Sequence, residues 1–211
     1  MAKLFNPTTN KTTNQNIVKH DSHVAPNERA TLLGQQPLTL WLTGLSAAGK
    51  STLAYALERA LIDAGRACYV LDGDNVRHGL NSNLGFSEAD RTENIRRIAE
   101  VAKLMNEAGL IVIAAFISPT IADRSMAKAI IGANQFSEVY VSTPLLACEA
   151  RDPKGLYAKA RSGELANFTG ISALYEPPTA ADLTLDTLST SLQDNVQRLL
   201  LLCSKKSVNS N

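Results

Sequence analysis

The stretch LTLWLTGLSAAGKST, residues 38–52, places a glycine-rich loop directly after an apolar run. From Gly44 to Ser51 the loop matches the pattern GxxxxGK[ST]. In such loops the backbone N–H groups receive phosphate oxygens, the lysine reaches the β- and γ-phosphates, and the last hydroxyl binds Mg²⁺. An ordinary glycine-rich turn is the alternative, but the strand pattern before the loop and the helix pattern after it favour a nucleoside triphosphate site. The residues expected to form this site are Gly44, Leu45, Ser46, Ala47, Ala48, Gly49, Lys50, Ser51 and Thr52.

Short apolar runs and helical periodicity alternate along the chain. The candidate strands are residues 38–43, 67–71, 110–117, 138–142 and 183–186. After the loop, Leu53, Leu57 and Leu61 recur at the spacing of one helix face, and Gly65 is the expected helix end. A longer helix is expected over residues 88–107. The alternation predicts an α/β fold, a doubly wound central parallel sheet of about five strands with helices on both faces.

The composition of the chain limits its size and its partners. Its 211 residues, 45% hydrophobic and 19% charged, suit one domain that buries roughly 70% of its unfolded surface. A net charge of +1 gives no global basic field, so we expect neither nucleic acid nor a membrane as partner. The three cysteines form no CxxC pair and have no histidine at ligand spacing, which argues against zinc and disulfides.

The two ends of the chain differ from its centre in composition. Residues 1–15 are rich in Thr, Asn and Lys and are expected to form a disordered tail, and residues 203–211 a flexible tail. Residues 16–202 form the expected domain. The N-terminal stretch has no apolar signal-peptide core, and no run reaches the roughly 18 apolar residues of a membrane span. A cytoplasmic location is therefore expected.

A second loop, DGDNVRHGL at residues 72–80, follows the strand pattern ACYVL. Carboxylates at the carboxyl end of a parallel strand lie at the edge where open α/β sheets bind ligands. Phosphoryl transfer needs carboxylates there, for Mg²⁺ or for the accepting hydroxyl. We expect Asp72 to bind Mg²⁺ together with Ser51, and Asp74 to orient or deprotonate the hydroxyl. A turn in which the carboxylates bind their own backbone is the alternative.

Arg91 extends an apolar helix stripe that includes Ile95 and Ile98. A charged side chain on a buried stripe needs a partner of opposite charge. A crossover helix begins at the ligand-binding edge of the sheet, so this position predicts an anionic second substrate. An arginine that extends to solvent or pairs with a local acid is the alternative. Arg124, in a later helix pattern, is expected to matter less for that substrate.

Five stretches of the chain together resemble the adenylylsulfate kinase family. They are GLSAAGKST, DGDNVRHGLNSNLGFSEADRTENIRRIAEVAKLM, FISP, DPKGLYAKAR and FTGI, and the resemblance runs over about residues 16–202. It implies a P-loop kinase of sulfate assimilation that uses ATP and Mg²⁺ to phosphorylate the 3′-hydroxyl of adenylyl sulfate, giving 3′-phosphoadenylyl sulfate and ADP. It also implies a homodimer. Another P-loop small-molecule kinase and a non-catalytic nucleotide-binding module are the competing interpretations.

The resemblance assigns roles to individual residues. The acceptor-binding positions are Asp74, Arg77, Phe86, Arg91, Asn94, Ile117, Ser118, Lys154 and Phe168, and the expected catalytic residues are Ser118, Lys50 and Asp74. Residues 151–178 look like a lid, although a solvated helix and loop would have the same composition. The family serine at the position of Ser118 is assigned as a phosphorylated intermediate. Here it is also a good N-cap for a helix over residues 120–131, and no base is evident beside it.

Three residues depart from the family pattern. Ala47 replaces a loop glycine, which costs on the order of 1 kcal/mol if that position needs a positive φ. Ser172 stands where the family has an acid, and Leu174 where it has proline. Because of these two changes, the family pattern does not predict the geometry and local charge around FTGI.

Overall fold

Five parallel strands form the centre of the molecule, in the order β2-β3-β1-β4-β5. The computed structural model describes residues 17–18 and 20–208. The strands are β1 (Leu38–Thr43), β2 (Cys68–Asp72), β3 (Ile111–Ala115), β4 (Phe136–Val141) and β5 (Leu183–Leu185). The doubly wound α/β sheet predicted from the alternation of apolar runs is confirmed, with strand ends shifted by a few residues.

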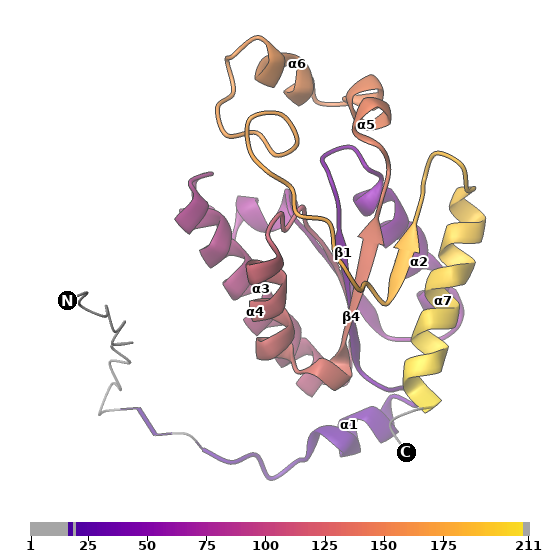
Figure 1. Ribbon diagram of the computed structural model, residues 1–211. Coiled ribbons are helices and arrows are strands. Elements are labelled where there is room, and N and C mark those ends of the chain that lie inside the picture. Colours follow the sequence, from indigo (N-terminus) through magenta and orange to yellow (C-terminus); the bar gives the residue numbers. More distant parts are fainter. Residues whose placement is uncertain (1–16, 19, 209–211) are drawn as a thin grey trace, which may run out of the picture.

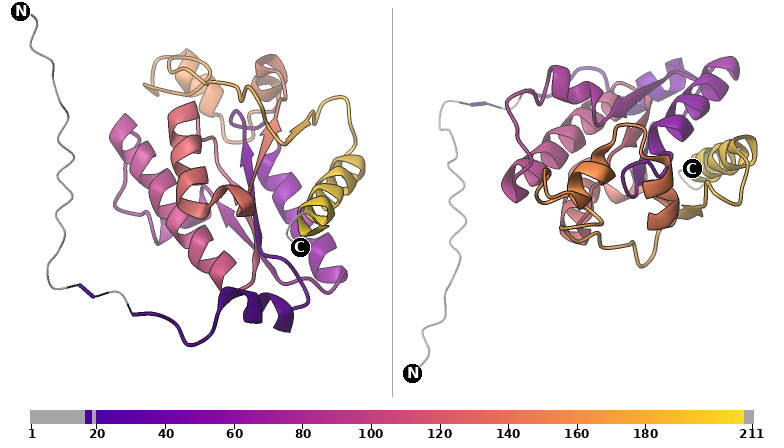
Figure 2. Two further views of the ribbon diagram at one scale, coloured as in Figure 1. Left: turned by 60° about the horizontal axis from the view of Figure 1, so that its bottom comes forward. Right: turned by 90° about the horizontal axis from the view of Figure 1, so that it is seen from above.

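Seven α-helices surround this sheet in the described part of the chain. They are α1 (Pro26–Leu32), α2 (Lys50–Asp63), α3 (Glu88–Glu107), α4 (Ile121–Ile131), α5 (Leu145–Arg151), α6 (Leu156–Arg161) and α7 (Leu192–Val208). Helices α3 and α4 pack together on one face of the sheet, and α2 and α7 on the other (Figure 1). Helices α5 and α6 lie beyond the end of the sheet opposite α1 (Figures 1 and 2).

The apolar stripes seen in the sequence form the two cores. Leu53, Leu57 and Leu61 of α2 pack against one face of the sheet, and Ile95 and Ile98 of α3 against the other. Every residue of β1 is buried, as expected for a parallel strand covered on both faces. Its Trp41 stacks between Phe116 and Phe136, with ring centroids 5.8 and 5.9 Å apart. Both stripes and the central strand therefore agree with the sequence pattern.

Two helix boundaries differ from those expected. Helix α4 begins at Ile121 with Thr120 as its N-cap, because the Thr120 hydroxyl accepts a hydrogen bond from the Asp123 N–H. Helix α7 continues through Val208, so residues 203–208 are helical rather than part of a flexible tail. The continuation follows from the i, i+4 spacing of Leu199 and Cys203, both buried. The expected tail at residues 1–15 lies outside the described residues.

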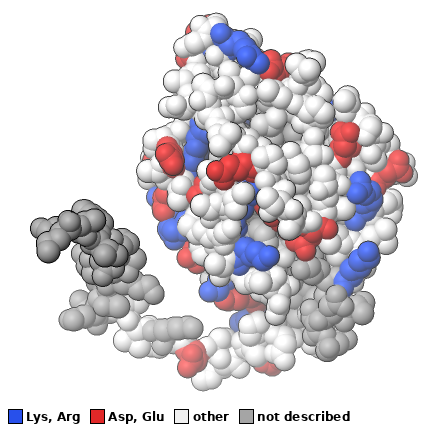
Figure 3. Space-filling view, in the orientation of Figure 1, with Lys and Arg blue, Asp and Glu red and all other residues white. Residues whose placement is uncertain are grey.

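The surface carries charges of both signs. On the face drawn in Figure 3, basic and acidic side chains are interspersed rather than gathered in patches of one sign. In the described part of the chain, no helix combines the length and apolar character needed to cross a bilayer.

Candidate active site

A cavity of about 1020 Å³ opens at the carboxyl ends of the strands. Its walls come from the loops after β1, β2 and β3, the start of α3 and residues 151–169. The predicted site residues that line it are Ser46, Ala47, Gly49, Lys50, Ser51, Thr52, Asp72, Asp74, Arg77, Phe86, Arg91, Asn94, Ile117, Ser118, Lys154 and Phe168. Gly44, Leu45 and Ala48 belong to the loop but do not line the cavity. The structure thus brings the two halves of the predicted site to one place.

The loop after β1 has the backbone geometry that its glycines suggested. A Cβ on Gly44 would lie 2.5 Å from the carbonyl oxygen of Val141, so no larger residue fits there. Ala47 adopts φ +57°, the left-handed region that favours glycine, at a cost on the order of 1 kcal/mol. The family departure at this position therefore strains the loop.

Lys50 begins α2 and lies under the loop. Its ammonium donates hydrogen bonds to the carbonyl oxygens of Gly44 at 2.9 Å and Leu45 at 2.6 Å. Burial lowers the pKa of Lys50 from 10.5 to about 8, although the nearby acidic groups Asp72 and Asp74 favour the charged form. A buried cation whose hydrogen-bond partners in the described part of the chain are carbonyl groups is suited to receive an anion.

Ser51 and Asp72 lie in contact at the base of the cavity. The Ser51 hydroxyl donates to Oδ2 of Asp72 at 2.7 Å. Oδ1 of Asp72 accepts from the Asp74 N–H at 3.0 Å, which fixes the carboxylate. A hydroxyl and a carboxylate fit Mg²⁺, which prefers oxygen ligands and takes few of them from protein.

Asp74 projects into the cavity from the loop after β2. Its carboxylate forms an ion pair with Lys154, which belongs to the segment after α5. Both side chains are more than half exposed. The pair therefore joins the segment at residues 151–178 to the loop that carries the candidate base.

Arg77 and Arg91 line the arm of the cavity beside α3. Arg77 lies over the ring of Phe86, 4.4 Å from its centroid. Arg91 donates to the Phe86 carbonyl at 3.0 Å, to Oγ1 of Thr169 at 2.8 Å and to the Asn167 carbonyl at 2.5 Å. All three partners are uncharged, and burial together with the charge of Arg77 lowers the pKa of Arg91. The two half-buried guanidinium groups therefore form a candidate binding site for an anion, which would neutralise their charge.

Phe168 and Asn94 complete this arm. Phe168 lines the cavity and also packs edge-on against Tyr157, with centroids 5.0 Å apart. Phe86, by contrast, is 66% exposed. Oδ1 of Asn94 accepts a hydrogen bond of 2.9 Å from Asn81. The ring of Phe168 is therefore held by packing in the core, whereas the ring of Phe86 is exposed and accessible to a ligand.

The Ser172 departure leaves its turn in place. The Ser172 hydroxyl accepts a hydrogen bond of 2.9 Å from the Phe168 N–H, as a carboxylate could at this position. Leu174 is 75% exposed, so it has no packing role in this chain.

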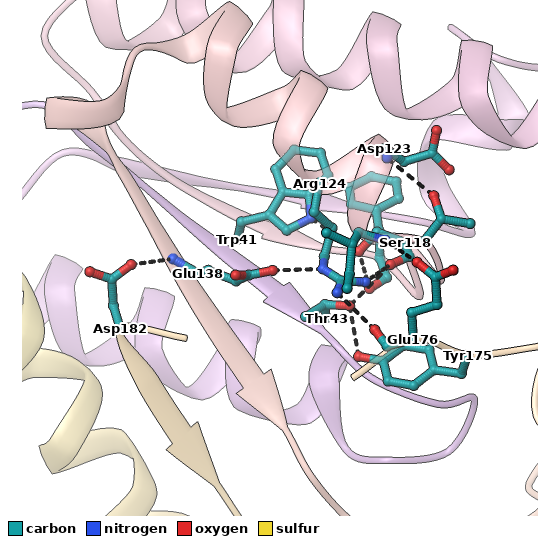
Figure 4. Close-up of polar contacts among 12 residues, drawn as sticks. Trp41, Thr43, Ser118, Asp123, Arg124, Glu138, Tyr175, Glu176 and Asp182 are labelled. Carbon is teal, nitrogen blue, oxygen red and sulfur yellow. Dashed lines mark hydrogen bonds and ion pairs between the residues drawn. The ribbon is translucent and has the colours of Figure 1, made fainter. Parts of the chain in front are cut away.

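Ser118 lines the floor of the cavity and does not cap α4. It is 2% exposed and adopts φ +38°. Its Oγ accepts from the indole N–H of Trp41 at 3.1 Å and donates to the Phe116 carbonyl at 3.5 Å (Figure 4). The expected N-cap role is wrong because Trp41 of β1 takes the hydroxyl inward, and Thr120 caps the helix instead.

Arg124 holds the backbone around Ser118. Its guanidinium donates to the Ser118 carbonyl at 2.8 Å, to the Glu176 carbonyl at 2.7 Å and to the Glu138 carboxylate at 2.6 Å (Figure 4). Arg124 is 3% exposed. It therefore joins α4, β4 and the chain after residue 174 at one buried point.

The far arm of the cavity contains residues that sequence reasoning missed. Arg151 donates to Oγ1 and to the carbonyl of Thr187, at 2.7 and 2.9 Å, and Thr187 donates to the Ala48 carbonyl at 2.8 Å. Leu192 and Asn195 line the same side. The stretch after β5 contains no recognisable motif. It reaches the glycine-rich loop after β1 because β5 pairs with β4. The position of residues 183–186 as the last strand was the one available signal.

Comparison with known proteins supports the resemblance. A model of the family described as adenylylsulphate kinase matches residues 36–186. A protein named adenylyl-sulfate kinase from Shewanella pealeana is 61% identical over 184 residues, covering 87% of this chain and 90% of its own. A structure described as a Mycobacterium tuberculosis APS kinase in complex with AMPPNP and APS superposes with a TM-score of 0.78 at 47% identity, covering 81% of this chain and 99% of its own.

More distant neighbours share the fold alone. A gluconokinase from Sinorhizobium meliloti superposes with a TM-score of 0.54 at 14% identity, covering 84% of this chain and 99% of its own. Arg77 and Arg91 belong to the stretch DGDNVRHGLNSNLGFSEADRTENIRRIAEVAKLM, which resembles the adenylylsulfate kinase family. On the family match and the identity over most of its length, the chain belongs to the adenylylsulphate kinase family.

Proposed function

We propose that the chain binds ATP and adenylyl sulfate in the two arms of this cavity and transfers the γ-phosphoryl group to the 3′-hydroxyl of adenylyl sulfate. One observation carries the proposal. The phosphate-binding loop and the half-buried Arg77 and Arg91 face one cavity of about 1020 Å³. That volume is at the upper end of small-molecule sites and suits two nucleotides better than one.

The loop after β1 receives the phosphates of ATP. Lys50 faces the β- and γ-phosphates, where its charge offsets the charge that develops on the transferring group. Ser51 and Asp72 would hold Mg²⁺, which would supply positive charge against the phosphates of ATP. The side formed by Arg151 and Thr187 leaves space for the nucleoside of ATP.

The arm beside α3 receives adenylyl sulfate. Arg77 and Arg91 bind the oxygens of its sulfo-phosphate group, and Phe86 and Phe168 offer faces on which the adenine stacks. Ile117 and Lys154 line the same arm. The uncharged partners of Arg91 support this assignment, because none of the hydrogen-bond partners that the described residues give this cation is an anion.

Asp74 positions the acceptor hydroxyl. The 3′-oxygen forms a bond to the γ-phosphorus while the bond from that phosphorus to the β-phosphate oxygen breaks, and ADP leaves. The proton of the hydroxyl passes to the Asp74 carboxylate and then to water. Residues 151–178 act as the lid, because their Lys154 already reaches Asp74 across the cavity mouth.

The assembly and the location follow from the resemblance and the composition. We propose a homodimer that acts in the cytoplasm, where a reducing environment agrees with the cysteine spacing. Light scattering coupled to size-exclusion chromatography tests the dimer.

A single incubation tests the reaction. The purified chain is mixed with ATP, Mg²⁺ and adenylyl sulfate, and the products are separated by chromatography. We expect equal amounts of ADP and 3′-phosphoadenylyl sulfate, and Lys50→Ala should lower turnover by a factor on the order of 10³ with circular dichroism unchanged. A panel of sugar and nucleoside acceptors is the control. Turnover of another acceptor but not of adenylyl sulfate would show a different kinase, and ATP binding without turnover a non-catalytic module.

A further inference from the structure

The side chain of Asn81 is buried directly behind Asn94. Asn81 is 0% exposed, and its Nδ2 donates a hydrogen bond of 2.9 Å to Oδ1 of Asn94. Its backbone is held on both sides, because its N–H donates to the Val76 carbonyl at 2.9 Å and its carbonyl accepts from the Leu84 N–H at 3.1 Å. Asn81 is therefore a rigid donor set into the loop before α3.

This contact fixes which atom Asn94 presents to a ligand. A carboxamide has an acceptor oxygen on one side and an NH₂ donor on the other. Because Oδ1 of Asn94 accepts from Asn81, Nδ2 is the atom left for the cavity that Asn94 lines. Within the described part of the chain, no hydrogen bond from this Nδ2 competes with a ligand.

The opposite arrangement of the two amides is less favourable. If both were turned over, Asn94 would donate to Asn81, and the NH₂ of Asn81 would face the buried position that its Oδ1 now occupies without a partner. A buried NH₂ leaves two hydrogens unmatched, whereas a buried carbonyl oxygen without a partner is tolerated more often. The chemistry of the pair thus supports the orientation in the structure.

We propose that Asn81 is a positioning residue that makes Asn94 a hydrogen-bond donor toward the acceptor nucleotide. The inference rests on the proposed function, since it deepens the assignment of this arm to adenylyl sulfate. It identifies the ligand atom opposite Asn94 as a hydrogen-bond acceptor, in the same arm as the cations Arg77 and Arg91. Asn81 touches no substrate and acts only through Asn94.

Replacement of Asn81 by aspartate reverses the polarity of the pair. In Asn81→Asp the carboxylate can only accept, so Asn94 turns its Nδ2 inward and presents Oδ1 to the ligand. We expect the KM for adenylyl sulfate to rise about 10- to 100-fold, the effect of one lost hydrogen bond and one buried mismatch. The KM for ATP should stay within about twofold, because the ATP arm is untouched.

A second variant, Asn94→Asp, should also present an acceptor to the ligand instead of a donor. Asn94→Asp keeps the hydrogen bond from Asn81 but also places an acceptor oxygen toward the ligand. It should reproduce the rise in the KM for adenylyl sulfate. Because Asn94 lines the cavity while Asn81 is 0% exposed, this variant keeps the proposal testable even if Asn81→Asp fails to fold.

Asn106 supplies the matched control. It is also 0% exposed, on the same helix as Asn94, and its amide accepts from Thr39 and donates to the Leu110 carbonyl at the far end from the cavity. Asn106→Asp should lower the melting temperature and leave the ratio of the two KM values unchanged.

The outcomes separate the inference from the proposed function. If the wild-type chain does not phosphorylate adenylyl sulfate, the proposed function fails. If the wild type is active but Asn81→Asp and Asn94→Asp leave the KM for adenylyl sulfate unchanged, or raise both KM values equally, the positioning role of Asn81 is wrong.

Discussion

The indole N–H of Trp41 donates a hydrogen bond of 3.1 Å to Oγ of Ser118. The hydroxyl in turn points to the Phe116 carbonyl, and none of these partners can take its proton. A nucleophilic serine requires an adjacent base. In-line transfer to a hydroxyl held by Asp74 needs no phosphorylated enzyme. Ser118 therefore supports the floor of the site without an evident route to a phosphoserine.

Ser118→Ala should retain turnover within about tenfold, because the change removes only the hydroxyl's hydrogen bonds with Trp41 and Phe116, and neither of these reaches a reacting group. Steady-state rates with adenylyl sulfate measure this effect. Trp41→Phe, which removes the same hydrogen bond from the other side, is the companion variant and should behave similarly. Isolation of a phosphoserine at position 118 that passes its phosphoryl group to adenylyl sulfate at the rate of turnover would establish a two-step mechanism instead.

The lowered pKa of Lys50 predicts that ATP binding depends on pH. In the free protein, burial brings the pKa of Lys50 to about 8, so the ammonium loses its proton as the pH rises through that value. Bound phosphates favour the charged form and raise the pKa of Lys50. Above pH 8, ATP binding should therefore take up a proton, and the Kd should rise by up to about tenfold per pH unit.

Titration calorimetry at pH 7 and pH 9, in buffers of different ionisation enthalpy, measures this proton uptake. Lys50→Met, which cannot titrate, is the control and should show weak binding without the pH step. The same lowered pKa of Lys50 should make ATP binding weaker but the folded protein more stable as the pH rises. The unfolded chain binds the Lys50 proton more tightly, so stability should rise with pH between about 8 and 10.5. A Kd for ATP that is constant from pH 7 to pH 9 would contradict the lowered pKa.

Local patterns predicted the scaffold of the site. The glycine spacing around Gly44, the periodicity of α2 and α3, and the carboxylates of the loop after β2 each depend on neighbours within one or two turns. Such short-range signals are sufficient to place Lys50 and Asp72 at the correct edge of the sheet.

Local sequence patterns could not predict contacts between segments that are distant in the chain. The sequence favoured Ser118 as the cap of α4, but its hydroxyl binds Trp41 from another strand, and Thr120 caps the helix instead. Arg151 and Thr187 meet because β5 lies beside β4, an order that no motif encodes. Such contacts depend on strand order and side-chain packing, which periodicity does not determine.

Arg91→Ala should weaken the binding of adenylyl sulfate far more than that of ATP. A charge-assisted contact contributes ~1.5–3 kcal/mol, which corresponds to a rise in the KM of about 10- to 150-fold. Arg96 is the matched control, because it lies on the same helix and its exposed side chain pairs with Glu93 and Glu100 of that helix. Arg96→Ala should leave both KM values near those of the wild type. Equal losses for ATP and adenylyl sulfate in Arg91→Ala would contradict a role specific to the acceptor.

Arg124 is a stability residue rather than a neutral control for Arg91. It is almost fully buried, pairs with Glu138 and donates to two carbonyl groups, so its removal leaves a partly buried carboxylate and two carbonyls unmatched. Arg124→Ala should lower the free energy of unfolding by about 3–5 kcal/mol, which corresponds to a fall in melting temperature of roughly 6–20 °C for a chain of this size. Urea unfolding and thermal melts measure both quantities.

A second variant separates the ion pair from the carbonyl contacts. Arg124→Met combined with Glu138→Leu removes both charges together, so no unpaired carboxylate remains and part of the loss should be recovered. The recovery should be incomplete, because the carbonyls of Ser118 and Glu176 still lack their donor. Full recovery would mean that these two contacts contribute nothing, and a melting temperature within about 2 °C of wild type in Arg124→Ala would contradict the buried network itself.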